Sequence, residues 1–423
     1  MYDRRQFLGA LAAPALVPLA APSPRRAIEV LARAAAAASE EEYWAEIGLA
    51  FTVDRSLVNL NNGGVSPSPA FVQQAMKRHL DYSNEAPPYT MWQILEPQRE
   101  AVRERLARFW AVDPEEIALT RNASEGLQIC QLGMELRAGD EVLTTTQDYP
   151  RMITTFRQRE RRDGIVLKQF SIPVPAEDPA EVVRRFESNI TPRTRVILVS
   201  HVVFLTGQIL PVPEIVAMAR RHGVPAIVDG AHALAHFDFT LAALDCDYYA
   251  TSLHKWLCAP HGTGLLYVRR EKIPGLWPLM AAEAAKDGDI RKFEEIGTHP
   301  AAPYLAIAEA LTFHQGIGAK RKADRLVHLR EYWIERLAGS DRVHLHTSRR
   351  PGLAGGIATV QVDGLESGAL AAWLWSAHRI LVTAIKHEEF EGIRVSPSVY
   401  TTHEELDRLV DAVEQAMREG LPG

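Results

Sequence analysis

The alternation of helical and strand patterns constrains the fold of this chain more than any other feature. From about residue 70 to residue 270, amphipathic helical stretches alternate with short apolar strands, of which four stand out: 117–120, 142–145, 196–200 and 226–229. Between the last two, residues 213–222 are apolar at helical spacing and end at Gly223, a typical helix stop. This pattern predicts an α/β fold, with a mostly parallel sheet covered by helices on both faces.

Polar residues follow directly after these strands. They are segments 121–126 and 147–150, residue His201, and segment 229–232. In an open parallel sheet, ligands bind beyond the carboxyl ends of the strands. We therefore expect these polar segments to line one binding site at a single edge of the sheet.

Lys255 is the candidate for covalent chemistry in this set. It follows the apolar stretch 248–253 and precedes the glycine-containing segment 261–264 and a further strand at 265–268. A single lysine is most often a solvated surface charge. A lysine among apolar neighbours has a lowered pKa and can form a Schiff base, and Asp229 lies at a strand end about 25 residues earlier, where it can hold a pyridinium nitrogen protonated. Pyridoxal 5'-phosphate (PLP) requires such a pair.

These motifs, taken in order, resemble a known family. The segments are 120–126, 148–150, 200–202, 228–232 and 252–256. Together they resemble the class V aminotransferase family of fold-type-I PLP enzymes, over about residues 55–415, and lie nearer to its isopenicillin N epimerase-like branch than to the desulfurases. The resemblance implies a large PLP-binding domain and a smaller α+β C-terminal domain.

The expected domain boundaries follow from this comparison and from local patterns. We expect a leader at residues 1–25, an N-terminal segment at 26–70, the large domain at 71–297 and the small domain at 298–423. Thr402 and Glu405 form a capping box that opens an amphipathic helix near the C-terminus, and residues 357–362 and 393–395 are apolar strand candidates. These elements favour an α+β arrangement for the small domain.

The resemblance also implies roles for individual residues. Lys255 is the Schiff-base lysine and proton shuttle, Asp229 holds the pyridinium nitrogen, and His232 and Tyr149 contact the cofactor ring as further catalytic groups. The remaining cofactor-binding residues are Ala123, Ser124, His201, Ser252, His254 and Thr298, of which Thr298 reaches the neighbouring site of a homodimer. Arg394 and Asn62 are expected to bind the substrate, Arg394 through its α-carboxylate. A helix start that carries Ser124 is equally compatible with a plain helix cap.

The sequence leaves the reaction open. Epimerase (racemase), aminotransferase and lyase reactions all begin with removal of the α-proton, and an epimerase needs a second acid, for which Tyr149, His201 and segment 386–387 are candidates. Phe204 stands where many relatives carry an Asn that bonds the cofactor. No cysteine follows Cys258, so persulfide chemistry is not expected. A non-catalytic exported binding protein of the same fold is the alternative, and the presence of both Lys255 and Asp229 argues against it.

Other classes of ligand find little support. His232 and His236 have metal-ligand spacing but lack a third ligand, so we expect no metal. Lys and Arg number 47 against 53 Asp and Glu, a net charge of −6, which argues against nucleic acid as a partner. We expect a small-molecule substrate that carries an amino group.

The first residues predict the cellular location of the protein. Arg4 and Arg5 precede Phe7, Leu8 and a modest apolar run, a pattern typical of a twin-arginine signal peptide. The run is too short to span a bilayer, which takes about 20 apolar residues. We therefore expect an exported, periplasmic protein with no stable membrane span once the leader is removed.

Overall fold

The computed structural model describes residues 25–422. The predicted leader therefore lies outside the described residues, apart from its last position. Within the described residues no helix is both long and apolar enough to cross a membrane.

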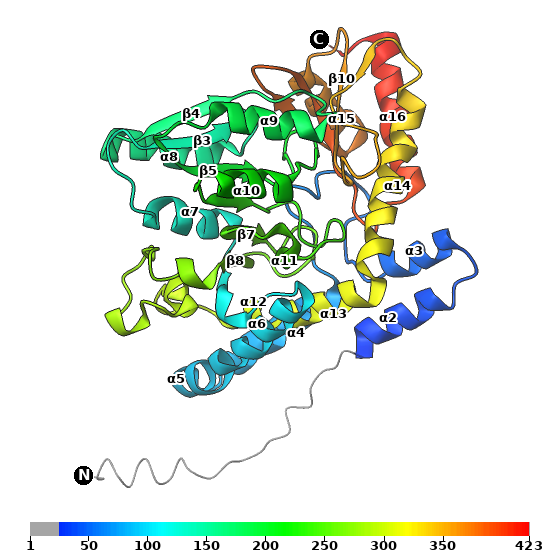
Figure 1. The fold of residues 1–423 in the computed structure, drawn as a ribbon. Helices are drawn as coiled ribbons and strands as arrows, with labels where there is room; N and C mark the ends of the chain where they lie inside the picture. Colours follow the sequence, from blue (N-terminus) through cyan, green and yellow to red (C-terminus); the bar gives the residue numbers. More distant parts are fainter. Residues whose placement is uncertain (1–24, 423) are drawn as a thin grey trace.

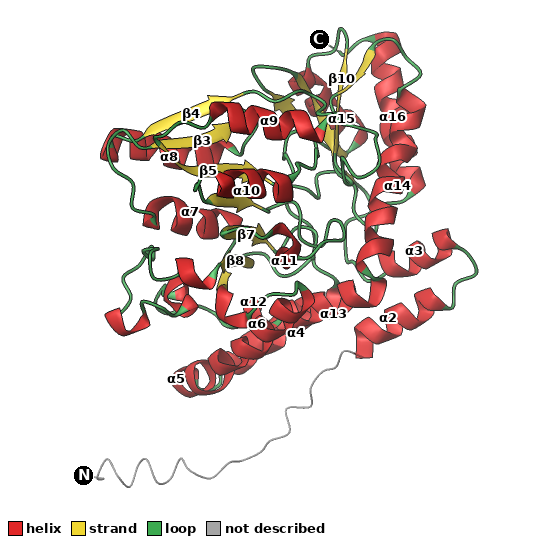
Figure 2. Ribbon diagram, viewed as in Figure 1, coloured by secondary structure: helices red, strands yellow, loops and turns green. Residues whose placement is uncertain are grey.

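The main structural element is a seven-stranded sheet (Figures 1 and 2). Its order is β2 (Ile117–Thr120), β8 (Gly264–Val268), β7 (Tyr248–Ser252), β6 (Ala226–Asp229), β5 (Thr194–Ser200), β3 (Glu141–Thr145) and β4 (Val166–Phe170). Strands β7, β6, β5, β3 and β4 pair in parallel, whereas β8 is antiparallel to both of its neighbours. The prediction of a mostly parallel sheet is confirmed.

Helices cover both faces of this sheet. Alternate strand residues point to opposite sides: Val196 and Leu198 of β5 belong to one apolar core, and Ile197 and Val199 to another. On the first face lie α7 (Ala123–Gly133) and α8 (Pro150–Asp163). On the second lie α9 (Pro179–Asn189) and α10 (Val212–Arg221), each with buried residues in that core.

A second, antiparallel sheet forms the C-terminal domain. Its order is β12 (Thr383–Lys386), β13 (Glu391–Val395), β10 (Ala358–Val362) and β9 (Val343–Leu345). The helices α14 (Ala319–Leu337), α15 (Ser367–His378) and α16 (His403–Glu419) pack on it through a separate apolar core. The predicted capping box is present, because Thr402 and Glu405 each bond the other's backbone N–H at the start of α16.

Two segments depart from the expected boundaries. Helices α12 (Ala302–Leu305) and α13 (Ile307–Ile317) contact α4 (Ala70–Ser83) and α6 (Arg99–Phe109), and their buried side chains join the large core although they follow residue 298. Conversely, β1 (Val58–Asn59) pairs in parallel with β11 (Ile380–Leu381), so the N-terminal segment enters the small domain. An apolar pattern shows that a helix face is buried, but it does not show against which core.

The remaining elements are short or peripheral. They are α2 (Arg25–Ala35), α3 (Glu40–Gly48), α5 (Pro87–Tyr89), η1 (Thr90–Leu95), η2 (Glu96–Gln98), η3 (Pro114–Glu116), α11 (Leu241–Leu244), η4 (Arg270–Lys272), η5 (Ala284–Lys286) and η6 (Ile290–Glu294). Helices α2 and α3 pack against each other, and α2 also contacts α13 (Figure 1).

Candidate active site

A pocket of about 530 Å³ opens at the carboxyl ends of the parallel strands. It collects residues from the segments after β2, β3, β5, β6 and β7, together with a loop near residue 63 and two residues of the small domain. The lining residues that matter for the chemistry are Gly63, Ala123, Ser124, Tyr149, Ser200, Val202, Phe204, Asp229, His232, Ser252, His254, Lys255, Thr383 and Arg394. The expected gathering at one edge is confirmed for segments 121–126, 147–150 and 229–232, whereas His201 does not line the pocket.

Asp229 is buried in this pocket and Lys255 is partly buried. Burial lowers the pKa of Lys255 to about 8, while the nearby Asp229 carboxylate acts in the opposite direction. Burial likewise raises the pKa of Asp229 to about 6, against the stabilising hydrogen bond that its Oδ1 accepts from the Ala231 N–H at 2.9 Å. The site thus holds a lysine that is readily deprotonated near a carboxylate that ends β6.

His232 completes this group. Its Nε2 lies 3.0 Å from Nζ of Lys255, and burial together with the neighbouring Lys255 and Arg394 holds its pKa well below the ordinary value, so the ring is neutral. Its Nδ1 is buried and has no hydrogen-bond partner among the described residues. A buried unpaired ring nitrogen costs stability. It is an atom that a polar ligand in the pocket would satisfy.

His236 holds the loop that carries His232. Its Nδ1 donates to the His232 carbonyl at 2.7 Å, and its Nε2 accepts from the Gly356 N–H at 2.6 Å. The ring stacks on Trp256 with centroids 3.8 Å apart. Both ring nitrogens of His236 are therefore engaged with backbone groups, so His236 is a structural residue and does not form a metal-ligand pair with His232.

The N-terminus of α7 forms the anion-binding end of the pocket. Asn122 caps the helix by accepting from the Glu125 N–H at 2.9 Å, and Oγ of Ser252 accepts from the Ala123 N–H at 3.0 Å. A Cβ at Gly264 would lie 2.6 Å from Cα of Asn122, so only glycine lets β8 approach this turn. Free N–H groups and the helix dipole at such a terminus favour phosphate. Ala123, Ser124, Ser252 and His254 meet here, as expected.

Arg394 is a buried cation without a carboxylate partner in the described part of the chain. Its Nη1 donates to the Phe204 carbonyl and its Nη2 to Oδ1 of Asn61, both at 2.8 Å, while its Nε has no partner. Burial lowers its pKa to about 10. A buried unpaired charge is costly, and a guanidinium binds a carboxylate through two parallel hydrogen bonds. The site therefore favours a carboxylate ligand.

Tyr149 is positioned by a residue whose role the sequence did not reveal. Oδ2 of Asp148 accepts from the side chains of Thr144 and Thr145 and from the Thr145 N–H, and Oδ1 accepts from the N–H and Oγ of Ser200. Asp148 thereby joins the ends of β3 and β5. The next residue, Tyr149, projects into the pocket, where its ring packs edge-on against Phe204 at 5.2 Å.

The structure does not bring His201 into the pocket, contrary to its expected place beside the cofactor. Ser200 and Val202 face the pocket, and the side chain between them points to the opposite side, as strand periodicity requires. The His201 ring packs edge-on against Phe237 and Phe239, and burial lowers its pKa to about 3. His201 is a core residue behind the site.

The structure also assigns Asn62 a structural role. Its Nδ2 donates to the carbonyls of Asn59 and Ser396, and its Oδ1 accepts from the Tyr400 hydroxyl at 2.6 Å. The loop that carries Asn62 does line the pocket, but through Gly63 and Gly64, and its contact with Arg394 is made by Asn61. Asn62 anchors that loop to the small domain instead of binding substrate.

Thr298 lies away from this pocket. It lines a second one, of about 490 Å³, with Arg99, Glu294 and His299 among its neighbours. Its expected contact with the phosphate of a neighbouring site would need a second chain. That role stays a prediction.

The residues present fit PLP by their own chemistry. A phosphate suits the start of α7, a ring nitrogen suits Asp229, a polar oxygen suits the unpaired Nδ1 of His232, and Lys255 stands ready for covalent attachment. This fold and this site define a fold-type-I PLP enzyme. The family model for aminotransferase class-V matches residues 58–409, and the chain belongs to that family.

Curated relatives refine this assignment. Isopenicillin N epimerase of Amycolatopsis lactamdurans is 32% identical over 398 residues, covering 88% of this chain and 98% of the relative. The enzyme of the same name from Streptomyces clavuligerus is 32% identical over 396 residues, with the same coverage. A probable cysteine desulfurase of Synechocystis is 26% identical over 389 residues, covering 86% of this chain and 91% of the relative. The predicted resemblance to the epimerase branch is confirmed.

Solved structures support the fold and the cofactor. The cystine C–S lyase C-DES in complex with its product cysteine persulfide superposes with a TM-score of 0.75 at 26% identity, covering 84% of this chain and 97% of that one. Another structure of C-DES, with glycine covalently linked to the PLP cofactor, gives the same score and identity, covering 84% and 96%. The Escherichia coli cysteine desulfurase CsdA, at 21% identity, has a TM-score of 0.76 over 89% of this chain and 98% of its own, and shows the fold alone. The predicted fold class and the cofactor are confirmed.

Proposed function

We propose that this PLP-dependent enzyme epimerises an α-amino acid at its α-carbon. The observation that carries the proposal is the pocket's content: two proton carriers, Lys255 and Tyr149, share it with Arg394, a buried cation that has no carboxylate partner among the described residues. PLP, when bound, supplies an electron-poor ring that spreads the negative charge left when the α-proton is removed.

Arg394 defines the class of substrate. Its guanidinium is held by the Phe204 carbonyl and Asn61, so its orientation is set before a ligand arrives. The unpaired Nε shows that donor capacity remains. A substrate with an α-carboxylate would neutralise the buried charge, whereas a simple amine would leave it unpaired.

Lys255 is the base in this proposal. Its pKa of about 8 leaves a useful neutral fraction near neutral pH, and general bases work best when their pKa lies near the working pH. The neutral His232 ring at 3.0 Å fixes the position of Nζ without adding charge.

Tyr149 is the proposed second acid. Of the sequence candidates, His201 points away from the pocket, and neither Lys386 nor His387 lines it. Nε2 of His387 lies against the Thr146 carbonyl. Tyr149 lines the pocket and is 36% exposed, so its hydroxyl can exchange protons with solvent. Return of a proton from a group other than Lys255 is what inversion requires.

Thiol chemistry finds no support in this pocket. All three cysteines, Cys130, Cys246 and Cys258, are buried, and burial raises the pKa of each. None of them lines the pocket. A persulfide mechanism needs an accessible thiolate, so the reaction of the desulfurase relatives is not the one proposed here.

An aminotransferase is the second candidate, because Lys255 alone suffices for transamination. The deciding experiment incubates purified PLP-loaded enzyme in D₂O with panels of L- and D-amino acids. Inversion with deuterium at the α-carbon and a persistent visible cofactor band supports epimerisation. Bleaching of the band with release of a keto acid supports transamination, and release of ammonia or a side-chain fragment supports a lyase. No deuterium exchange with any amino acid would overturn all three.

The Tyr149→Phe variant tests the second acid. We expect it to keep α-proton exchange while losing inversion by about 10²-fold, the range typical of a lost general acid. Loss of exchange and inversion in equal measure would contradict the assigned role and leave Tyr149 as a ring-packing residue.

We also propose that the enzyme is a homodimer with shared sites and that it is exported. Co-expression of Lys255→Ala chains with Thr298→Ala chains would restore one intact site in each mixed dimer if Thr298 contributes to the site of the neighbouring chain.

For export, Arg4→Lys together with Arg5→Lys would retain the protein in the cytoplasm, as cell fractionation would show. Unchanged secretion would contradict the twin-arginine route.

A further inference from the structure

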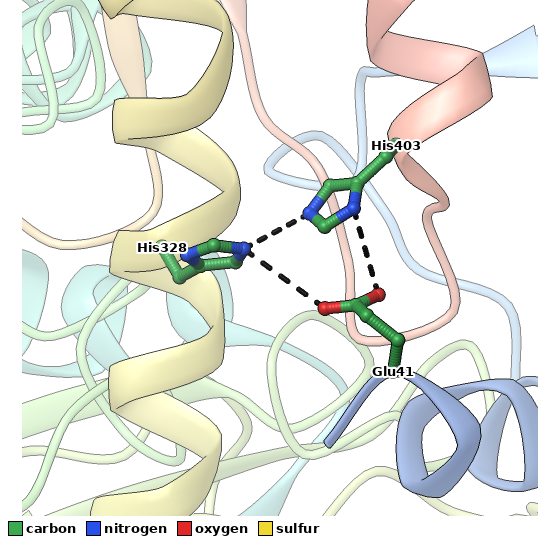
Figure 3. Close-up of side chains that lie close together, drawn as sticks. All are labelled: Glu41, His328 and His403. Atoms are coloured by element: carbon green, nitrogen blue, oxygen red, sulfur yellow. Dashed lines mark hydrogen bonds and ion pairs between the residues drawn. The ribbon is translucent and has the colours of Figure 1, made fainter. Parts of the chain in front are cut away.

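A cluster of metal-ligating side chains lies outside the active site. Glu41 on α3, His328 on α14 and His403 at the start of α16 each present a ligand atom, and these atoms lie within 4.8 Å of one another (Figure 3). None of the three lines the PLP pocket. Residues from three distant parts of the sequence thus converge on one point.

The two imidazoles face each other. Nε2 of His328 lies 2.9 Å from Nε2 of His403, and Glu41 approaches both rings, with Oε1 at 4.0 Å from Nε2 of His328 and Oε2 at 3.7 Å from Nδ1 of His403 (Figure 3). Partial burial and the neighbouring Arg325 lower the pKa of His328, which favours the neutral ring. Neutral imidazole is the form that binds metal.

Neighbouring groups fix the orientation of two of these ligands. The Tyr332 ring stacks on His403 with centroids 4.2 Å apart, and its hydroxyl donates to Asp407 at 3.0 Å. Arg325 donates to both oxygens of Glu41, at 2.6 and 3.1 Å, and these contacts lower the pKa of that carboxyl. Partners of this kind set the position of metal ligands in proteins.

Among the described residues, Arg325 is the cation bonded to Glu41, and it opposes metal binding there. It uses one lone pair on each carboxylate oxygen, and each oxygen retains another. Its side chain is 3% exposed, whereas Glu41 and His328 are about half exposed, so the open side of the cluster faces solvent. A cation can therefore approach without displacing Arg325.

We propose that Glu41, His328 and His403 bind Zn²⁺, with water as the fourth ligand. Two imidazoles and one carboxylate are a donor set that zinc accepts in tetrahedral geometry. The ion would tie α3 to α14 and α16, and so fasten the segment that follows the leader to the small domain. The sequence did not indicate this site because its ligands are 287 and 75 residues apart.

The test uses the PLP-loaded full chain after removal of metals with a chelator. Titration with Co²⁺ is expected to produce the visible absorption bands of a tetrahedral site, saturating at one equivalent and displaced by Zn²⁺. His403→Gln is expected to abolish the bands. His344→Gln is the matched control, since His344 is also exposed and also lies beside a carboxylate, Asp363. It should titrate like the parent protein.

A stability measurement gives a second readout. Zn²⁺ at about 100 times its dissociation constant should raise the melting temperature of the parent by about 2 °C or more, and that of His403→Gln by less than half as much. Should His403→Gln fail to retain its PLP band, Glu41→Gln decides the matter in the same assays. Absence of saturable Co²⁺ bands in the parent, or bands of equal strength in all variants, would overturn the site and leave a hydrogen-bonded histidine pair.

Discussion

Nζ of Lys255 lies 3.0 Å from Nε2 of the buried His232. The Asp229 carboxylate, whose own pKa is raised to about 6 by burial, acts on the charge of this lysine. Desolvation of the ammonium group and the nearby Arg394 lower the pKa of Lys255 to about 8, while the Asp229 carboxylate opposes this shift.

The first prediction concerns attachment of PLP to the apo-protein. Only the neutral amine attacks the aldehyde, and below pH 8 its fraction rises about tenfold per pH unit. The rate constant for appearance of the visible band should therefore rise about tenfold from pH 6 to pH 7 and level off above pH 8. Free N-acetyl-lysine is the control for the cofactor's own titration, and Lys255→Ala should give no band. A rate that keeps rising to pH 10 would contradict the lowered pKa.

The second prediction concerns Asp229→Asn. Removal of the carboxylate takes away the charge that holds the Lys255 pKa up, so the inflection of the attachment profile should move below pH 8. Because the carboxylate is expected to keep the ring nitrogen protonated, kcat should fall by about 10²–10³-fold, more than the affinity for PLP. An unchanged kcat together with a lower affinity for PLP would show that Asp229 contributes only to cofactor binding.

Arg394 supplies the third prediction. Arg394→Gln should raise KM for an α-amino acid by roughly 10²-fold, the cost of losing a buried charge-assisted contact, and Arg394→Lys should rescue little because an ammonium lacks the planar fork. The deuterium-exchange rate of the corresponding amine without a carboxylate is the control. If the variant loses activity equally toward the amino acid and toward the amine, Arg394 has a structural role and does not bind the substrate carboxylate.

Much of this site could be predicted from the sequence. The order of strand-end segments predicts the location of the site, because parallel strands bring their carboxyl ends to one edge of the sheet. The Asp229 and Lys255 motifs predict the cofactor. What failed was side-chain direction. His201 and Asn62 belong to segments that do reach the pocket, but their own side chains point away from it. Neighbouring residues of an extended segment face opposite sides, and the sequence does not show which of them faces the pocket.

Contacts between residues far apart in the sequence could not be predicted either. From the sequence, Asp148 looks like a turn residue, and its role follows only from its contact with Ser200. Arg394 is held by Phe204 and Asn61, which lie 190 and 333 residues away in the sequence. The same holds for the α12 and α13 helices, whose buried side chains join the large core although the expected boundary lies before them at residue 298. Contacts of this kind depend on how the two domains meet, and local patterns carry no signal for that.

The last prediction concerns His236 and acid. Burial lowers its pKa to about 3, whereas an exposed histidine in the unfolded chain has a pKa of about 6.5. Between these values the unfolded state binds a proton that the native state does not, so stability is full above pH 6.5 and falls as the pH drops. The loss is about 1.4 kcal/mol per pH unit for this one group.

His236→Gln isolates that contribution. At pH 7 the variant should lose about 1–3 kcal/mol, since the His232 carbonyl and the Gly356 N–H lose a well-placed partner. Between pH 6 and pH 5, however, its unfolding free energy from urea titrations should fall less steeply than that of the parent, by about 1.4 kcal/mol per unit. Equal slopes for the parent and His236→Gln would mean that His236 takes up its proton in the folded protein, and that the His232 loop tolerates a charge beneath it.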